Sequence, residues 1–158
     1  MPEKKFKAKI CQCCGQAENY MLGMDKGSAE IVLSILSRIS EKEINEIHPS
    51  RELEMTGDKK WQITNLSKPR FHGLIAFVKD KPGYYCLTRK AGLFLKGEPI
   101  PKYAIVSKVT GHNDGYYGDE TVTLRDLMTS GVTWSGYEEK MIDRLYSKQT
   151  NSLFDDIR

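Results

Sequence analysis

The chain has 158 residues, of which 39% are hydrophobic and 28% are charged, and its formal net charge is +3. This length predicts one domain with a terminal appendage, whose core is large enough to fold unaided. The longest apolar run is only a few residues, which excludes a membrane-spanning helix, and the basic start MPEKKFKAKI has no apolar segment of the secretory kind.

Residues 1–26 are expected to form a basic arm and a cysteine knuckle, followed by a polar linker that runs to about Lys26. Four lysines in the first ten residues could follow phosphates or a minor groove, or could serve as a solubilising tail. Three cysteines crowd together at positions 11, 13 and 14, and the fourth lies at position 86. Adjacent cysteines rarely bridge each other, so we expect reduced thiols and a cytosolic location.

The motif Cys11-x-x-Cys14-Gly15 has the spacing at which two thiolates can approach one metal ion. Zinc bound by Cys11 and Cys14 is therefore a candidate cofactor. A structural zinc needs four ligands, and the sequence contains no second pair of this kind. The candidates to complete the site are Cys13, Cys86, His48, His72 and His112. A metal-free turn and a redox-active pair are the alternatives.

Residues 27–102 are expected to form the main domain. Apolar residues spaced by threes and fours from Ile31 to Ile39 predict an amphipathic helix, with Ser28 as its cap. The helix either continues past Ser40 or a second one begins there through a capping box, and a break falls before Pro49.

A basic helix is expected next, with Asp58 as its cap. Either a fresh helix begins at Ser67 or the same helix continues with a kink at Pro69. Turn chemistry at positions 80–83 predicts a hairpin with strands over 74–78 and 84–88. A short helix over 89–96 follows and ends at Gly97.

Positive charge is concentrated in residues 57–102, which hold ten Lys and Arg against three acids, a net of +7 that leaves −4 for the rest of the chain. Such a concentration favours a polyanionic partner, although solvated cations that only keep the protein soluble would look the same. Lys68 and Arg70 are expected to read bases in a major groove, with His72 as a weaker third. The residues expected to contact DNA are Lys59, Lys60, Lys68, Arg70, His72, Lys79, Lys81 and Lys90.

Residues 103–158 are expected to form a strand and helix extension. Strands are predicted over 103–109 and 121–124, with a loop over 111–119 between them, and a helix over 134–148. That helix would present Tyr137, Met141, Ile142 and Leu145, and it is a candidate dimer element. From residue 112 onward five cations face nine acids, so this end would point away from DNA or contact a protein.

Several of these segments resemble a family of uncharacterised bacterial and phage proteins. The resemblance is carried by the cysteine knuckle and by FHGLIAFV, PGYYCLTRKAGLFLKGE and PKYAIVSKV, over roughly residues 11–15 and 60–125. It implies an α+β fold with a winged helix-turn-helix core, a short β wing and a C-terminal strand and helix extension. Pro69 in the recognition helix and the helix after Trp134 depart from the family pattern.

Together these features predict a cytoplasmic winged-helix protein that binds double-stranded DNA, as a small regulator or a phage accessory factor. The alternative is a protein-interaction module that docks on a host or phage protein. The sequence has no phosphate-binding glycine loop, nucleophile elbow or paired-carboxylate motif, so we do not expect an enzyme. The aromatic residues are scattered and are expected to pack within the fold rather than to stack on bases.

Overall fold

The computed structural model describes residues 7–49, 65–129 and 131–147. Within them the protein is a mixed structure of helices and small antiparallel sheets, as the expected α+β class requires. The helices are α1 (Lys26–Lys42), α4 (Ser67–Phe71), α5 (Arg89–Leu95), α6 (Leu124–Leu127) and α7 (Gly136–Tyr146). The strands are β1 (Asn19–Gly23), β2 (Ile75–Phe77), β3 (Tyr85–Leu87), β4 (Ile100–Pro101), β5 (Tyr103–Ser107), β6 (Asn113–Tyr116) and β7 (Thr121–Val122). None of the described helices has the length and apolar character needed to cross a membrane.

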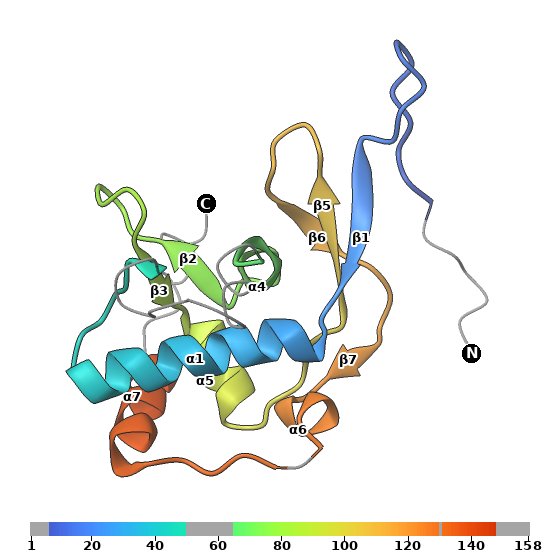
Figure 1. Cartoon of the computed structure of the whole chain (residues 1–158). Coiled ribbons are helices and arrows are strands. Elements are labelled where there is room, and N and C mark those ends of the chain that lie inside the picture. The colour runs from blue at the N-terminus through green and yellow to red at the C-terminus, as the bar shows by residue number, and fades with distance from the viewer. Residues whose placement is uncertain (1–6, 50–64, 130, 148–158) are drawn as a thin grey trace.

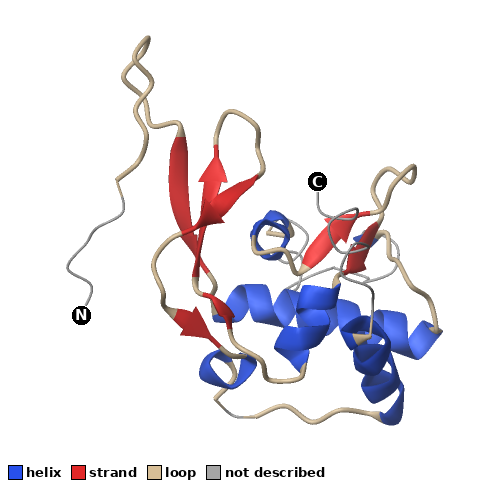
Figure 2. Cartoon of the chain, turned by 180° about the vertical axis from the view of Figure 1, so that it is seen from behind, coloured by secondary structure: helices blue, strands red, loops and turns tan. Residues whose placement is uncertain are grey.

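The longer helices and the strands occupy different sides of the molecule (Figures 1 and 2). Helices α1, α5 and α7 pack together on one side. On the other side stand the β2–β3 hairpin and a three-stranded antiparallel sheet in the order β1-β5-β6, with the short α4 between them. A pair of short strands, β4 and β7, lies close to α6. Helix α4 is therefore flanked by two β elements.

Helix α1 forms the centre of the core. The predicted apolar face is confirmed, because Ile31, Ile35 and Ile39 are at most 1% exposed. The helix begins earlier than expected: the carboxylate of Asp25 accepts a hydrogen bond from the Ser28 amide at 2.8 Å. Ser28 is thus a buried residue inside the helix, and its assignment as the cap was wrong.

The end of α1 follows one of the two alternatives that the sequence left open. Glu43 adopts a left-handed conformation with φ of 55°, which ends the helix. Ser40 is helical and buried, so no second helix begins there. The chain then forms an isolated β-bridge at Ile47. The first of the two alternatives is therefore confirmed, because α1 continues past Ser40 and ends at Lys42.

Helix α7 covers α1 and α5 with one apolar face. Met141, Ile142 and Leu145 are buried, as their spacing predicts, whereas Tyr137 is 62% exposed and does not belong to that face. These three residues join the same core cluster as Phe94 of α5. Residues from the C-terminal part of the chain thus help to bury the central helices.

Two strands appear where the sequence predicted loops. Strand β1 lies in the segment expected to be a polar linker and pairs antiparallel with β5, with Tyr20 opposite Val106. Strand β6 lies within the expected loop over 111–119 and pairs with the other edge of β5. The strand predicted over 121–124 is shorter than expected. β7 ends at Val122, because Thr123 caps α6, which begins at Leu124.

The hairpin and the helix after it agree with the sequence. Strands β2 and β3 pair with Ile75 opposite Leu87, and α5 begins directly after β3. Helix α4 begins at Ser67, as one of the two alternatives predicted. The expected basic helix capped by Asp58 lies outside the described residues.

Thr88 joins the hairpin to α5 and provides a stability test. Its buried hydroxyl accepts the Ala91 amide at 3.2 Å and donates to the Gly73 carbonyl at 2.5 Å. The substitution Thr88→Val keeps the shape but removes both hydrogen bonds, so we expect a loss of about 2 kcal/mol in the free energy of unfolding. Thr88→Ser keeps the hydroxyl and should lose less. Urea denaturation measures both, and equal losses would contradict this role of the hydroxyl.

Candidate nucleic-acid interface

The β2–β3 hairpin is attached to the helical body on both of its sides. On one side it follows α4 through Gly73, whose φ of 78° reverses the chain after the helix. On the other side Ile47 and Tyr85 exchange backbone hydrogen bonds of 2.9 and 2.8 Å. Strand β3 therefore lies between β2 and the segment that follows α1. These attachments fix the position of the hairpin relative to α4.

Arg70 of α4 is held against the hairpin by aromatic rings. Its guanidinium carbon lies 4.5 Å from the ring centroid of Phe71 and 4.8 Å from that of Phe77. Phe77 in turn contacts Tyr85 at 5.1 Å between ring centroids. Partial burial lowers the pKa of Arg70 from its ordinary value, yet the group stays charged at neutral pH. The arrangement holds a cation in place beside the half-exposed ring of Phe77.

Lys68 lies on the same helix and reaches towards the start of α1. Its Nζ is 3.9 Å from Oδ2 of Asp25, and the two side chains are 40% and 53% exposed. An ion pair this exposed contributes about 0–1 kcal/mol. A phosphate group could therefore replace Asp25 as the partner of Lys68 at little cost.

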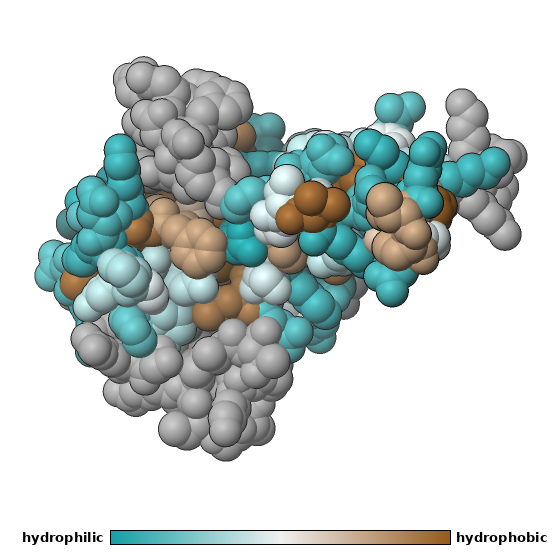
Figure 3. Space-filling view, turned by 90° about the horizontal axis from the view of Figure 1, so that it is seen from above, coloured by the Kyte–Doolittle hydropathy of each residue, from teal (hydrophilic) through white to brown (hydrophobic). Residues whose placement is uncertain are grey.

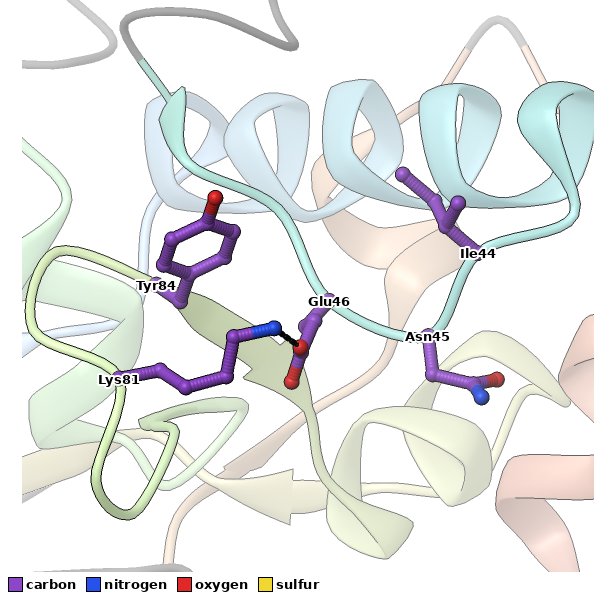
Figure 4. A pocket seen from close by; sticks show the side chains of 5 residues that line it. All are labelled: Ile44, Asn45, Glu46, Lys81 and Tyr84. Carbon is purple, nitrogen blue, oxygen red and sulfur yellow. Dashed lines mark hydrogen bonds and ion pairs between the residues drawn. The ribbon is translucent and has the colours of Figure 1, made fainter.

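The turn of the hairpin presents the next two lysines. Lys79 is exposed at this turn, next to Asp80, whose φ is 66°. Lys81 points back across a shallow cleft of 410 Å³ and forms an ion pair with Glu46 (Figure 4). The hydrogen bond to Glu46 raises the pKa of Lys81 above 10.5, and its Nζ also lies 4.5 Å from the ring centroid of Tyr84.

One of the residues expected to contact DNA is buried, and the ammonium of another is bonded to a tyrosine. His72 has no exposed surface, so it is not placed to read bases as the sequence predicted. Burial, with a further effect of the charge on Lys90, lowers the pKa of His72 to about 4. The ammonium of Lys90 lies 4.2 Å from the ring centroid of Tyr116 and donates a hydrogen bond to its hydroxyl. Burial lowers the pKa of Lys90 to about 8, which reduces its charge in mildly alkaline solution.

The remaining two predicted contacts, Lys59 and Lys60, lie outside the described residues. The other side chains at this surface were not found by the sequence argument. The rings of Phe71 and Phe77 contact Arg70. Two lysines that the sequence argument treated as unpaired form ion pairs, Lys68 with Asp25 and Lys81 with Glu46. The sequence could have indicated only the contact of Arg70 with Phe71, because these two residues are adjacent in the chain. Phe77, Asp25 and Glu46 belong to other parts of the fold.

The surface around α4 mixes cations with aromatic rings. Figure 3 shows this part of the protein from above, with hydrophobic side chains lying among hydrophilic ones. On the sheet side, Tyr20 is 37% exposed and has Lys108 5.9 Å from its ring centroid. Cations and flat rings on one surface suit the phosphates and bases of a nucleic acid.

The cysteine knuckle lies at the tip of a separate hairpin (Figure 1). The Cys11 amide donates a hydrogen bond to the Gln16 carbonyl at 2.8 Å, and the Gly15 amide donates one to the Cys11 carbonyl at 2.9 Å. The backbone of Cys14 and of Cys13, and the thiol of Cys14, form hydrogen bonds that lower the pKa of Cys11. Within the described residues, no three Cys, His, Asp or Glu side chains come together as a metal site.

Comparison of the chain with models of protein families, with curated proteins and with solved structures finds no match. The resemblance seen in the sequence motifs therefore remains an expectation. The function has to be argued from the geometry around α4 and the hairpin.

Proposed function

We propose that this protein binds double-stranded DNA through α4 and the β2–β3 hairpin, arranged as a winged helix. The observation that supports this best is the bridge between Ile47 and Tyr85. It places a short strand segment after α1 beside β3, so that the order along the chain is helix, strand segment, α4 and hairpin. A winged helix has the same order, with the helix before the hairpin in the major groove and the hairpin as the wing.

The proposed contacts follow from exposure and from the strength of the existing pairs. Two aromatic rings hold the guanidinium of Arg70 in place, and a guanidinium is well suited to bind guanine or phosphate. Lys68 and Lys81 now pair with single carboxylates at the surface, and exchange for phosphates would release counterions from the DNA. Lys79 would contact the backbone from the turn, and Lys59 and Lys60 remain in the proposal. His72 and Lys90 are left out, because His72 is buried and the ammonium of Lys90 is hydrogen-bonded to Tyr116.

The biological role proposed with this binding is that of a small regulator or a phage accessory factor. Such a role would place the protein in the cytoplasm, where its cysteines would stay reduced. None of the four cysteines, all of which lie in the described residues, forms a disulfide.

The test is fluorescence anisotropy of labelled duplex DNA across a salt series. For Lys68→Glu/Arg70→Glu we expect the affinity to fall by about thirtyfold and the slope against salt to decrease by about two. The matched control is Arg125→Glu/Lys140→Glu, which changes the charge equally at exposed positions of α6 and α7. These two helices lie on the other side of α1 from α4 (Figure 1).

Equal losses in both double variants would mean that only the overall charge matters, and would reject α4 as the interface. No binding by the wild type at low salt would reject DNA binding altogether. The protein-interaction module would then become the leading alternative. It predicts a protein that co-purifies with the chain equally well in the presence and absence of the α4 substitutions.

A further inference from the structure

The hairpin at the start of the described chain carries a pair of thiols in a shaped turn. Cys11 and Cys14 lie in the same turn, which is closed by backbone hydrogen bonds from Cys11 to Gln16 and from Gly15 to Cys11. The Cys-x-x-Cys spacing in such a closed turn lets two thiolates approach one metal ion.

One copy of the chain cannot supply the other two ligands from its own cysteines and histidines. All four cysteines and all three histidines lie within the described residues. Among those residues no third ligand joins Cys11 and Cys14. His72 is fully buried, and Cys86 belongs to β3 in the body of the protein. The thiol pair could supply two of the four N or S ligands that a structural zinc site normally has.

We infer that Cys11 and Cys14 of two copies of this chain bind one zinc ion between them, so that the metal joins two hairpins tip to tip. The position of the pair favours this arrangement. The hairpin, closed by the bridge between Ile10 and Ala17, projects away from the body of the protein (Figure 1). Cys14 is exposed, and Ile10 beside the turn is 54% exposed. A second copy can therefore approach the tip without meeting the body of the first.

Charge and apolar surface at the hairpin agree with such a junction. One zinc ion with four thiolates has a net negative charge, which nearby cations would offset. Lys7 and Lys9 are exposed just before the turn, and the ammonium of Lys9 lies 3.8 Å from a carboxylate oxygen of Glu18. Burial of Ile10 against its copy would add a small apolar contribution. This inference does not depend on the proposed binding of DNA.

The test uses the full chain, kept reduced and freed of metal, and cobalt(II) as a spectroscopic substitute for zinc. We expect saturation at one cobalt ion per two chains, with the strong thiolate-to-cobalt absorption of a tetrahedral site. Native mass spectrometry with zinc should show twice the chain mass of 18.0 kDa, and chelation should return the single chain. Cys11→Ser/Cys14→Ser should abolish both the absorption and the dimer. Cys13→Ser, at an exposed position of the same turn, should keep both.

Three results would overturn the inference. Saturation at one metal ion per chain in a monomer would show that the chain completes the site by itself. Loss of binding in Cys13→Ser would show a different ligand set. Absence of thiolate-to-cobalt absorption from the reduced wild type would show that the pair does not bind metal in this way.

Discussion

The substitution Gly92→Ala is expected to lower the free energy of unfolding by about 3 kcal/mol, through overpacking between α5 and α7. A Cβ atom at this position would lie 2.7 Å from the backbone nitrogen of Tyr146 and 2.8 Å from the Cβ of Leu145. Neither atom is the end of a flexible side chain, so α7 itself would have to move. Alanine is the better helix former, and a gain of about 0.5–1 kcal/mol partly offsets the loss.

The last turn of α7 cannot move freely. The Tyr146 carbonyl accepts a hydrogen bond from Nε of Arg89 at 3.1 Å, and Lys96 pairs with Asp143 at 2.7 Å. A shift of the helix would weaken these contacts and the packing of Leu145 in the core. The loss should therefore appear as a lower urea midpoint with little change in slope.

The matched control for this prediction is Gly136→Ala, in the first turn of α7. No atom lies within 4 Å of a Cβ built there, so the same substitution should be neutral or slightly stabilising. A wild-type midpoint for Gly92→Ala would contradict the close approach of α5 and α7.

The second large effect concerns pH. Burial lowers the pKa of His72 from 6.5 to about 4, so the folded protein resists protonation of a group that the unfolded chain protonates readily. The unfolded state then binds more protons between these two values, and stability falls as the pH is lowered through this window. A shift of this size corresponds to a loss of about 3 kcal/mol between about pH 7 and about pH 4. Above the unfolded pKa the group has no such effect.

The surroundings of His72 explain why the neutral form is retained. The cation of Lys90 opposes protonation, while Asp25 favours it more weakly. The backbone of Leu22 and Gly23 lies near the ring, yet neither ring nitrogen makes a well-formed hydrogen bond within the described residues. An apolar side chain should thus be tolerated at this position at neutral pH.

His72→Leu separates this group from the carboxylates that also titrate in acid. Urea denaturation across the pH range should show that the wild type loses about 3 kcal/mol more than the variant on acidification. The matched control is His112→Leu, which removes a histidine from an exposed position instead of a buried one. Parallel curves for His72→Leu and the wild type would contradict the buried, neutral state of this histidine.

The sequence by itself determined the local elements. The spacing of Ile31, Ile35 and Ile39 identified α1, and the turn residues at 80–83 identified the hairpin. The beginning of α5 after Thr88 was also visible. Periodicity, turn chemistry and helix stops act between residues close in the chain, so a single sequence contains their signal. The spacing of the first and third cysteines of the knuckle likewise indicated a thiol pair.

The tertiary structure alone decided which distant segments meet. Strand β1 exists because β5, far along the chain, offers it a partner, and its polar sequence did not predict a strand. His72 is buried because the backbone turns at Gly73 with the ring towards β1 and α5, a placement that helical spacing did not predict. The lysines expected to bind a partner are not equally free to do so. Lys68 and Lys81 form ion pairs with carboxylates from other parts of the chain, Asp25 and Glu46. Charge content is fixed by composition, but whether a charge is free for a partner depends on long-range packing.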